Sequence, residues 1–333
     1  MNNKTQSRKK NTKKLLILIL LILTLTTGCT KTLVDKNKKA IKNEETGQNL
    51  TENILCQPTN KKSIAKYKEN KVNIDKLPTC DKFKINSGKY EGIWTTVFVK
   101  PLAFVILQLG KTTGNYAIAL IIVTLIIRLI TYPLTRKTVK QSQVMQEVNP
   151  ELQRIQKKYA GKQDEESLSK QSQEMMMLYK KYNINPLSGC LFSFIQLPLF
   201  IAFYEAVQRF PAIFEDTFLG LQLGTTPWVG FTRSSFYIYI ILMLLIAATT
   251  YYSFKMNMSS NQLDNSMKSM PIFMSIMIIV TALFMPSALC VYWFFNNLCT
   301  ILQNKLVKVT MTKDNLKKGS KKNEKPAEKK IKK

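Results

Sequence analysis

An arginine stands inside an apolar segment that is long enough to cross a membrane. Residues 116–136 read YAIALIIVTLIIRLITYPLTR, with Arg128 in the second half of the run. A charged side chain at the centre of a spanning helix costs roughly 2.5–3.5 kcal/mol on insertion scales. Polar residues recur at helical spacing and form one stripe along this helix: Thr124, Arg128, Thr131 and Thr135. Such a stripe is typical of a helix that faces a bundle interior or a water-filled cavity.

A second interpretation of Arg128 is that its side chain reaches the membrane surface. Arg128 and Arg136 are about 12 Å apart along a helix that rises about 1.5 Å per residue. A long side chain of this kind can carry its charge to the headgroups. The stripe alone leaves both interpretations open.

The chain contains no histidine, and this removes several reaction classes. Ser-His-Asp and Cys-His nucleophilic sites and the HExxH zinc site all require an imidazole. The six cysteines show no CxxC and no metal-ligand spacing, and the sequence contains no GxxxxGK[ST] nucleotide motif. We therefore expect no catalytic residue, no metal and no cofactor, and we interpret the polar stripe as part of a binding surface.

The apolar residues are concentrated in long blocks. The chain has 333 residues, a formal net charge of +28 and 45% hydrophobic residues, and basic segments separate the blocks. This distribution is typical of an all-α membrane protein. The last block, residues 271–302, is too long for one span and is broken at Pro286, where a helix would end. We therefore predict five transmembrane helices, at about residues 115–135, 186–208, 234–254, 271–285 and 287–304.

Residues 1–28 have the features of a bacterial signal peptide. A basic segment without acids precedes an apolar run at residues 15–25, which is too short to span a bilayer comfortably. The run ends in TTGC, which resembles a lipobox, although Thr26 stands where a leucine is usual. We predict that the mature chain begins at Cys29 and that this cysteine is the site of lipid attachment, including palmitate. The alternative is an uncleaved signal anchor with a chance cysteine.

Residues 29–90 follow the signal and are expected outside the membrane. They are rich in lysine and asparagine and show little periodicity, so we predict a tether or a small irregular module. Cys56 and Cys80 lie in this segment. An external disulfide between them and two unrelated thiols are both compatible with the sequence.

Residues 91–110, EGIWTTVFVKPLAFVILQLG, predict an amphipathic helix that lies in the interface on the outer side of the membrane. Their apolar residues recur at three- and four-residue steps, and Lys100-Pro101 interrupts the run. A packed helix of a soluble domain is the alternative.

Two polar segments are expected in the cytoplasm because both carry an excess of basic residues. Residues 136–183 hold ten Lys/Arg and six acids, and two apolar stripes separated by a turn at Gly161 predict a helical hairpin. Residues 305–333 hold twelve lysines and three acids without apolar periodicity, and predict a disordered basic tail.

Polar residues on three of the predicted spans can converge on one cavity within the bilayer. The spans contain a single acid, Glu205, near the outer end of the second span. An ion-coupled transporter more often carries a buried acid near the midplane. We therefore predict a substrate groove with a positive charge, lined by Thr124, Arg128, Gln196, Tyr292 and Asn296.

Three segments, LIIRLITYPLT, NPLSGCLFSFIQLPLFIAFY and MPSALCVYWFFNNLCTILQ, carry a family resemblance. Over about residues 90–305 the chain resembles the membrane insertases of the YidC/Oxa/Alb family, in particular the lipoprotein-type members of single-membrane bacteria. The resemblance implies a hydrophilic groove that is open to the cytoplasm and to lipid. It also implies that Arg128 is the groove arginine, that Thr124 lies one turn before it, and that Trp293 is the aromatic residue that meets the substrate.

The function that the resemblance implies is to guide nascent membrane proteins from the cytoplasm into the bilayer, alone or with the Sec translocon. The implied partners are nascent membrane proteins, membrane lipid and, through the basic tail, the translating ribosome. Because lysines on a flexible chain bind any polyanion, lipid is the alternative partner of the tail. The implied location is the bacterial cell membrane, with the lipid-anchored N-terminus outside and the C-terminus in the cytoplasm.

Two other classes of membrane protein remain as alternatives. A small-molecule transporter or channel would predict internal repeats, broken helices and midplane acids, and the five segments show no repeat. An intramembrane protease would need a Ser-Lys pair or paired aspartates, and the predicted spans contain neither lysine nor aspartate.

Overall fold

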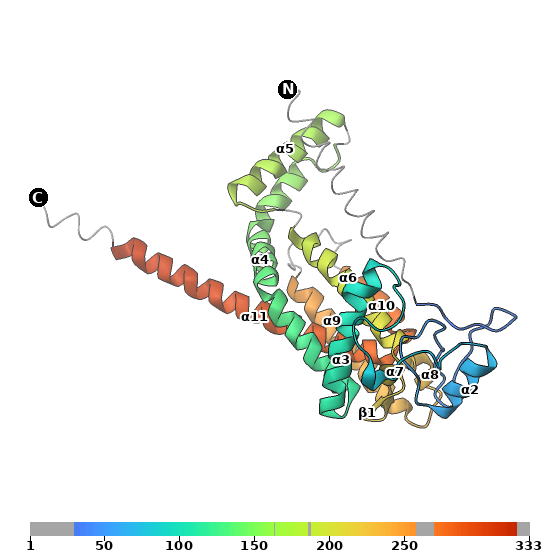
Figure 1. Cartoon of the computed structure of the whole chain (residues 1–333). Helices are drawn as coiled ribbons and strands as arrows, with labels where there is room; N and C mark the ends of the chain where they lie inside the picture. The colour runs from blue at the N-terminus through green and yellow to red at the C-terminus, as the bar shows by residue number, and fades with distance from the viewer. Residues whose placement is uncertain (1–29, 163, 186–187, 258–269, 325–333) are drawn as a thin grey trace, which may run out of the picture. The chain divides into compact units, whose positions relative to one another are not determined.

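The computed structural model describes residues 30–162, 164–185, 188–257 and 270–324, and almost all regular structure in them is helical (Figure 1). The chain divides into two compact units. Unit 1 comprises the described residues up to Val123, with Leu199–Tyr239 and Phe284–Leu289. Unit 2 comprises Thr124–Pro198, Ile240–Leu283 and the described residues from Cys290 onward. The predicted signal peptide and Cys29 lie outside the described residues.

The segment at residues 30–90 is a packed module and not an extended tether. Its one α-helix is α2 (Lys61–Glu69). At the start of this helix the Asn60 side chain accepts hydrogen bonds from the backbone N–H groups of Lys62 and Ser63, at 3.0 Å each. A short 3₁₀ turn, η1, spans Cys80–Lys82. Five buried residues of the segment form its core with Phe214: Leu33, Leu50, Ile54, Tyr67 and Ile74. Isolated β-bridges between loops replace regular strands, so the fold leaves little periodicity in the sequence.

A disulfide joins the two cysteines of this module. Cys56 and Cys80 are bonded, with their Cα atoms 4.9 Å apart. The bond attaches the loop before α2 to η1, and small domains with limited cores commonly depend on such a link.

The module packs against a loop region that belongs to the same unit. This region holds two short helices, α7 (Pro211–Phe214) and α8 (Pro227–Gly230). Between them lies a β-hairpin whose strands, β1 (Thr217–Phe218) and β2 (Leu221–Gln222), have two residues each. The buried Gln48 amide donates to the Phe214 carbonyl over 2.5 Å, and the Thr225 hydroxyl donates to the Thr46 carbonyl. These contacts fix the external module to the loops within unit 1.

A helix is present where residues 91–110 predicted one, but it lies further along the chain and is less regular than the sequence indicated. A π-helical turn, η2 (Thr95–Val99), leads directly into α3 (Lys100–Thr113). The wide turn lets the Lys100 N–H reach the Thr95 carbonyl, just before Pro101, which has no N–H to donate. Lys100-Pro101 therefore does not interrupt the helix, and α3 ends at Gly114 with φ of 73°.

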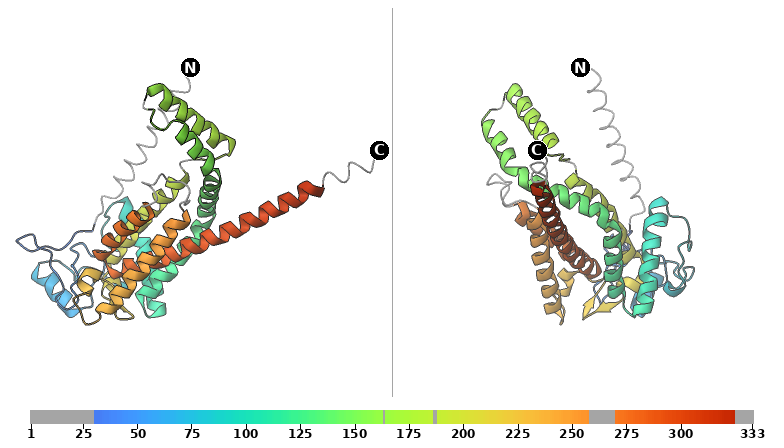
Figure 2. Two further views of the ribbon diagram at one scale, coloured as in Figure 1. Left: turned by 180° about the vertical axis from the view of Figure 1, so that it is seen from behind. Right: turned by 90° about the vertical axis from the view of Figure 1, so that its left-hand side faces the viewer.

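Helix α4 (Tyr116–Lys158) has 43 residues, so the first predicted span and the first arm of the hairpin form one continuous helix. The second arm is α5 (Glu165–Lys181), whose first turn is capped by Asp164 accepting from the Ser167 N–H over 2.8 Å. Figures 1 and 2 show α5 folded back along the C-terminal part of α4. The two arms share a core of Val148, Leu152, Leu178 and Ile184.

Four further helices complete the chain: α6 (Ser188–Arg209), α9 (Phe236–Asn257), α10 (Met270–Leu283) and α11 (Ser287–Glu324). The break between α10 and α11 falls at Pro286, as its sequence predicts. Among the described residues, two helices are long and apolar enough to cross a membrane, Tyr116–Lys158 and Phe236–Met256, and Ile272–Leu283 is a shorter apolar helix. The five-span arrangement therefore stays a proposal.

The prediction of a disordered tail from residue 305 is wrong for its first part, because α11 continues to Glu324. Val307 is fully buried, which shows an apolar contact that the charge run concealed. Lysine is also a good helix former, and no proline lies between Lys305 and Pro326. Residues 325–333 lie outside the described part of the chain.

Candidate binding site around Arg128

Arg128 is buried in unit 2 and is held by two side-chain amides from other helices. Only 5% of the residue is exposed. Its Nε donates to Asn296 Oδ1 over 2.9 Å and its Nη2 donates to the same oxygen over 2.5 Å. Nη2 also donates to Gln196 Oε1 over 3.3 Å. The guanidinium therefore joins α4 to α6 and α11, and it is directed into the contact between these helices.

A further hydrogen bond adds a second residue of the fifth predicted span to this network. Gln196 Nε2 donates to the Tyr292 hydroxyl over 2.8 Å. Gln196 is half-buried, whereas Tyr292 is almost fully buried. The structure thus brings together four of the predicted groove residues, namely Arg128, Gln196, Tyr292 and Asn296.

The other two predicted groove residues lie on the same elements. Thr124 is buried one turn before Arg128 on α4, and Trp293 is half-buried beside Tyr292 on α11. Helical spacing puts Thr124 and Arg128 on one face. Trp293 follows Tyr292 directly and therefore projects about 100° around the helix from it.

Polar contacts that the sequence did not reveal support the arginine. Gln303 is buried and donates from Nε2 to the backbone carbonyl of Arg128 over 3.2 Å. Thr300 donates to the Asn296 carbonyl over 2.9 Å, one turn along α11. Tyr292, Asn296, Thr300 and Gln303 recur at helical spacing in the sequence. Such a pattern on one helix does not specify which residues it contacts on another helix.

The electrostatics of this contact follow from the chemistry of its donors and acceptors. Asn296 and Gln196 present carbonyl oxygens, which accept from a guanidinium without carrying a formal charge. These two contacts therefore orient the Arg128 guanidinium and bring no formal charge of their own. In surroundings of low dielectric, a positive charge attracts an anion far more strongly than it would in water.

A different arginine network is found in unit 1. Arg209 is completely buried at the end of α6, and its guanidinium forms ion pairs with Glu91 and, over 3.5 Å, with Glu205. Trp94 Nε1 donates to the other Glu205 oxygen over 2.8 Å. Glu205, the only acid in the predicted spans, is therefore paired. The i, i+4 spacing of Glu205 and Arg209 was a usable signal for this pair, but the sequence did not indicate Glu91.

Comparison with known proteins assigns the family. The model of the family described as "60Kd inner membrane protein" matches residues 108–314, more than half of the chain. The chain belongs to this family. The matched residues include Arg128 and its two partners, Gln196 and Asn296.

The curated relatives are membrane protein insertases. The chain is 39% identical over 223 residues to "Membrane protein insertase YidC" of Oceanobacillus iheyensis, covering 66% of this chain and 86% of the relative. It is 38% identical over 217 residues to "Membrane protein insertase MisCA" of Bacillus subtilis, covering 65% of this chain and 79% of that protein. The resemblance to the YidC/Oxa/Alb insertases is therefore confirmed.

A solved structure gives the same result at the level of the fold. The chain aligns with "Active YidC insertase crystal structure with the first transmembrane domain resolved" at a TM-score of 0.50 and 25% identity. The alignment covers 66% of this chain and 48% of the other. The chain thus spans about half the length of that protein.

Proposed function

We propose that this protein is a membrane protein insertase whose polar contact around Arg128 lines a groove for nascent chains. The observation that carries the proposal is the Arg128 guanidinium, which is buried between α4, α6 and α11 and bound by neutral amides. Membership of the insertase family and the names of the relatives support the same function.

The proposed mechanism is physical and involves no covalent step. A short external segment of a nascent protein must cross hydrocarbon, where each unsatisfied backbone group costs several kcal/mol. A hydrated groove shortens this path, and Arg128 attracts negative charge on the segment. The adjoining apolar segment then moves sideways into lipid, driven by its transfer free energy.

Reconstitution tests the function directly. A small single-span protein would be synthesised in the presence of liposomes with or without the purified full-length chain, and insertion would be measured by protease protection. We expect protection to require the chain. Equal protection in protein-free liposomes of the same composition would contradict the proposal, and uptake of a small solute in place of insertion would favour the transporter or channel.

The topology forms part of the proposal. Five spans, with the N-terminus outside, place residues 30–113 outside the membrane and the α4–α5 hairpin in the cytoplasm. The excess of basic residues in the hairpin supports this orientation. Cysteine-labelling of the full chain in intact vesicles would test it, with Lys36→Cys labelled from outside and Lys170→Cys only after permeabilisation.

The signal sequence supports lipid attachment at Cys29 in the mature chain. The measurement is the intact mass of the purified protein, which we expect to correspond to a start at residue 29 with added acyl chains. A mass that includes Met1 would contradict lipid attachment and would make residues 15–25 an anchor.

The C-terminal part of α11 and the residues after it are proposed to contact the translating ribosome, and cooperation with the Sec translocon is proposed from the family. Twelve lysines after residue 304 support polyanion binding that weakens as salt rises. Deletion of residues 312–333 should lower ribosome co-sedimentation at low salt. Unchanged co-sedimentation, with reduced binding to anionic vesicles, would assign the tail to lipid.

A further inference from the structure

We propose that a pocket beside α3 in unit 1 binds the headgroup of an anionic phospholipid of the outer leaflet, with Lys84 as the residue that meets the phosphate. The inference rests on the outward placement of residues 30–113 in the proposed function. It concerns a site separate from the residues assigned to the substrate groove.

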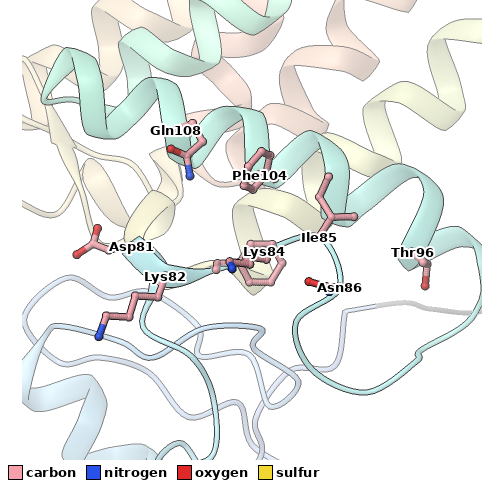
Figure 3. Close-up of a pocket in the computed structure, with 9 residues that line it drawn as sticks. Asp81, Lys82, Lys84, Ile85, Asn86, Thr96, Phe104 and Gln108 are labelled. Atoms are coloured by element: carbon pink, nitrogen blue, oxygen red, sulfur yellow. The ribbon is translucent and has the colours of Figure 1, made fainter.

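The pocket lies between α3 and the loop that follows η1, and has a volume of about 650 Å³ (Figure 3). Figure 3 shows Lys84 on the loop facing Phe104 and Gln108 on α3. Ile85 and Thr96 lie toward one end of the pocket, and Asp81 and Lys82 lie toward the other. The pocket therefore combines an ammonium, an amide and a hydroxyl with an aromatic ring and an aliphatic side chain.

The loop is held in place by contacts outside the pocket. The Lys100 ammonium is buried and donates to the carbonyls of Ser87 and Lys89, over 2.7 and 3.3 Å. The Lys84 N–H donates to the Ser87 hydroxyl over 2.9 Å. Phe83 is buried, with its ring centroid 4.8 Å from that of Phe210. The pocket is therefore formed before any ligand binds, which lowers the ordering cost of binding.

The lining chemistry matches a phospholipid headgroup better than a small inorganic anion. An ammonium is a strong donor to phosphate oxygens, and the Gln108 amide suits glycerol or ester oxygens. The Thr96 hydroxyl donates to the Gly92 carbonyl over 2.9 Å and can still accept from a glycerol hydroxyl. Phe104 and Ile85 suit the first carbons of an acyl chain. Lys84 places one ammonium in the lining, and Lys82, whose side chain extends away from α3 in Figure 3, adds a second positive charge at the end of the pocket that holds Asp81. The net charge of these three residues is positive, which favours an anionic headgroup.

The surface next to the pocket indicates contact with a bilayer. Six large apolar residues from the loop, η2 and α3 are 40–70% exposed: Ile85, Tyr90, Ile93, Val97, Phe98 and Val105. A row of exposed apolar residues on this scale marks an interaction surface, and on an amphipathic helix it is typical of interfacial membrane binding. Ile85 belongs both to this set and to the pocket lining, and the lining residues Thr96 and Phe104 are the chain neighbours of Val97 and Val105.

The charge of the external module supports an anionic partner. Residues 30–90 contain fourteen lysines and seven acids. This excess is opposite in sense to the positive-inside rule, so orientation does not account for it. Basic residues at a membrane surface are attracted to anionic headgroups. A lipid on residue 29, as proposed above, would hold the module beginning at Thr30 at that surface.

The test measures lipid retained by the full-length chain. Native mass spectrometry of the purified protein would compare phosphatidylglycerol and phosphatidylcholine with identical acyl chains. The pocket variant is Lys82→Ser/Lys84→Ser. The matched control is Lys36→Ser/Lys39→Ser, which removes two exposed lysines of the same module outside the pocket. We expect the wild type and the control to retain phosphatidylglycerol preferentially, and the pocket variant to bind it about fivefold more weakly for each lysine that is removed.

Several results would overturn the inference. They are equal retention of the two lipids by the wild type, equal phosphatidylglycerol retention by the pocket variant and the control, and full displacement of the lipid by inorganic phosphate. Insertion activity, measured in parallel on the same samples, separates the two proposals. Failure of the wild type to insert substrates would contradict the insertase function, whereas the lipid measurement reports only on this pocket.

Discussion

Two buried arginines in this protein have different surroundings, and the difference bears on the roles that we propose for them. In unit 1, Arg209 is paired with the carboxylates of Glu91 and Glu205. In unit 2, Arg128 is bound by the neutral amides of Asn296 and Gln196. A carboxylate neutralises the charge that it binds, whereas an amide only orients it. We therefore assign Arg209 to stability, whereas the proposed function gives Arg128 the attraction of acidic substrate segments.

The other contacts of Arg209 agree with a structural role. Its Nε donates to the Asn53 carbonyl over 2.9 Å, and its own carbonyl accepts from the Leu55 N–H over 2.8 Å. Arg209 thus joins α6 to the external module as well as to Glu91. The contacts of Arg128 come instead from residues that we assign to the groove.

The largest expected effect follows from removing the paired arginine. Arg209→Met leaves Glu205 buried without its cation, and breaking a buried ion pair in this way costs about 3–5 kcal/mol. We expect low yield and a lower midpoint of thermal unfolding in detergent, with Lys111→Met on the exposed surface of α3 as the control. Adding Glu205→Gln to Arg209→Met should recover part of the loss. If Arg209→Met had the same midpoint of thermal unfolding as the wild type, the structural role of Arg209 would be contradicted.

The disulfide of the external module should have a somewhat smaller effect. Cys56 and Cys80 are separated by 24 residues, and closing a loop of this size stabilises the native state by about 3 kcal/mol in the chain-entropy account. Cys56→Ser/Cys80→Ser should therefore unfold at lower temperature, and limited proteolysis should cleave residues 30–90 faster. Insertion by the intact double variant at low temperature should match the wild type. A selective loss of insertion without loss of stability would show that the module takes part in substrate handling.

Converting the surroundings of Arg128 into those of Arg209 would sharpen the comparison. Asn296→Asp places a carboxylate at the atom that now accepts from Nε and Nη2 of Arg128. Hydrogen bonds that involve a charged group contribute about 1.5–3 kcal/mol, so we expect a variant at least as stable as the wild type. Its insertion of substrates with acidic external segments should nevertheless fall, because the groove charge is neutralised. Undiminished insertion of those substrates would show that the charge of Arg128 does not act on them.

The smallest effect is expected in the exposed α4–α5 hairpin. Hydrogen bonds from Lys158 and Tyr159 lower the pKa of Glu174 below its ordinary value. Because the pKa of Glu174 is lower in the folded protein, the ionised carboxylate stabilises the fold at pH values above its ordinary pKa. This stabilisation is lost as the pH falls through the folded-state pKa. Because Lys158 is exposed and Glu174 is only half-buried, Glu174→Gln should barely change unfolding at neutral pH and should remove only a weak dependence at acidic pH. A large change at neutral pH would indicate that Glu174 has a role beyond this ion pair.

The sequence was sufficient for features that one helix or one turn determines. The stripe that contains Arg128, the helix break at Pro286 and the turn near Gly161 all depend on local spacing. The partners of the two arginines could not be derived in the same way, because Arg128 meets Asn296 at a separation of 168 residues and Arg209 meets Glu91 at 118. For residues 30–90 the sequence left a tether and a small irregular module open, because loops that pair through isolated bridges give no periodic pattern. The tail was misjudged because its lysines concealed a helix that buries Val307.

The most direct test of the account is a charge series at Arg128 with matched substrates. Wild type, Arg128→Lys and Arg128→Ala would be reconstituted in liposomes, with two substrates that share one apolar span and differ only in external Asp or Asn residues. Loss of a charge-assisted contact of about 1.5–3 kcal/mol predicts that Arg128→Ala inserts the acidic substrate at least about tenfold less well. Arg128→Lys should retain much of the activity, and the neutral substrate should be far less affected. Equal insertion of both substrates by wild type and Arg128→Ala would contradict the account.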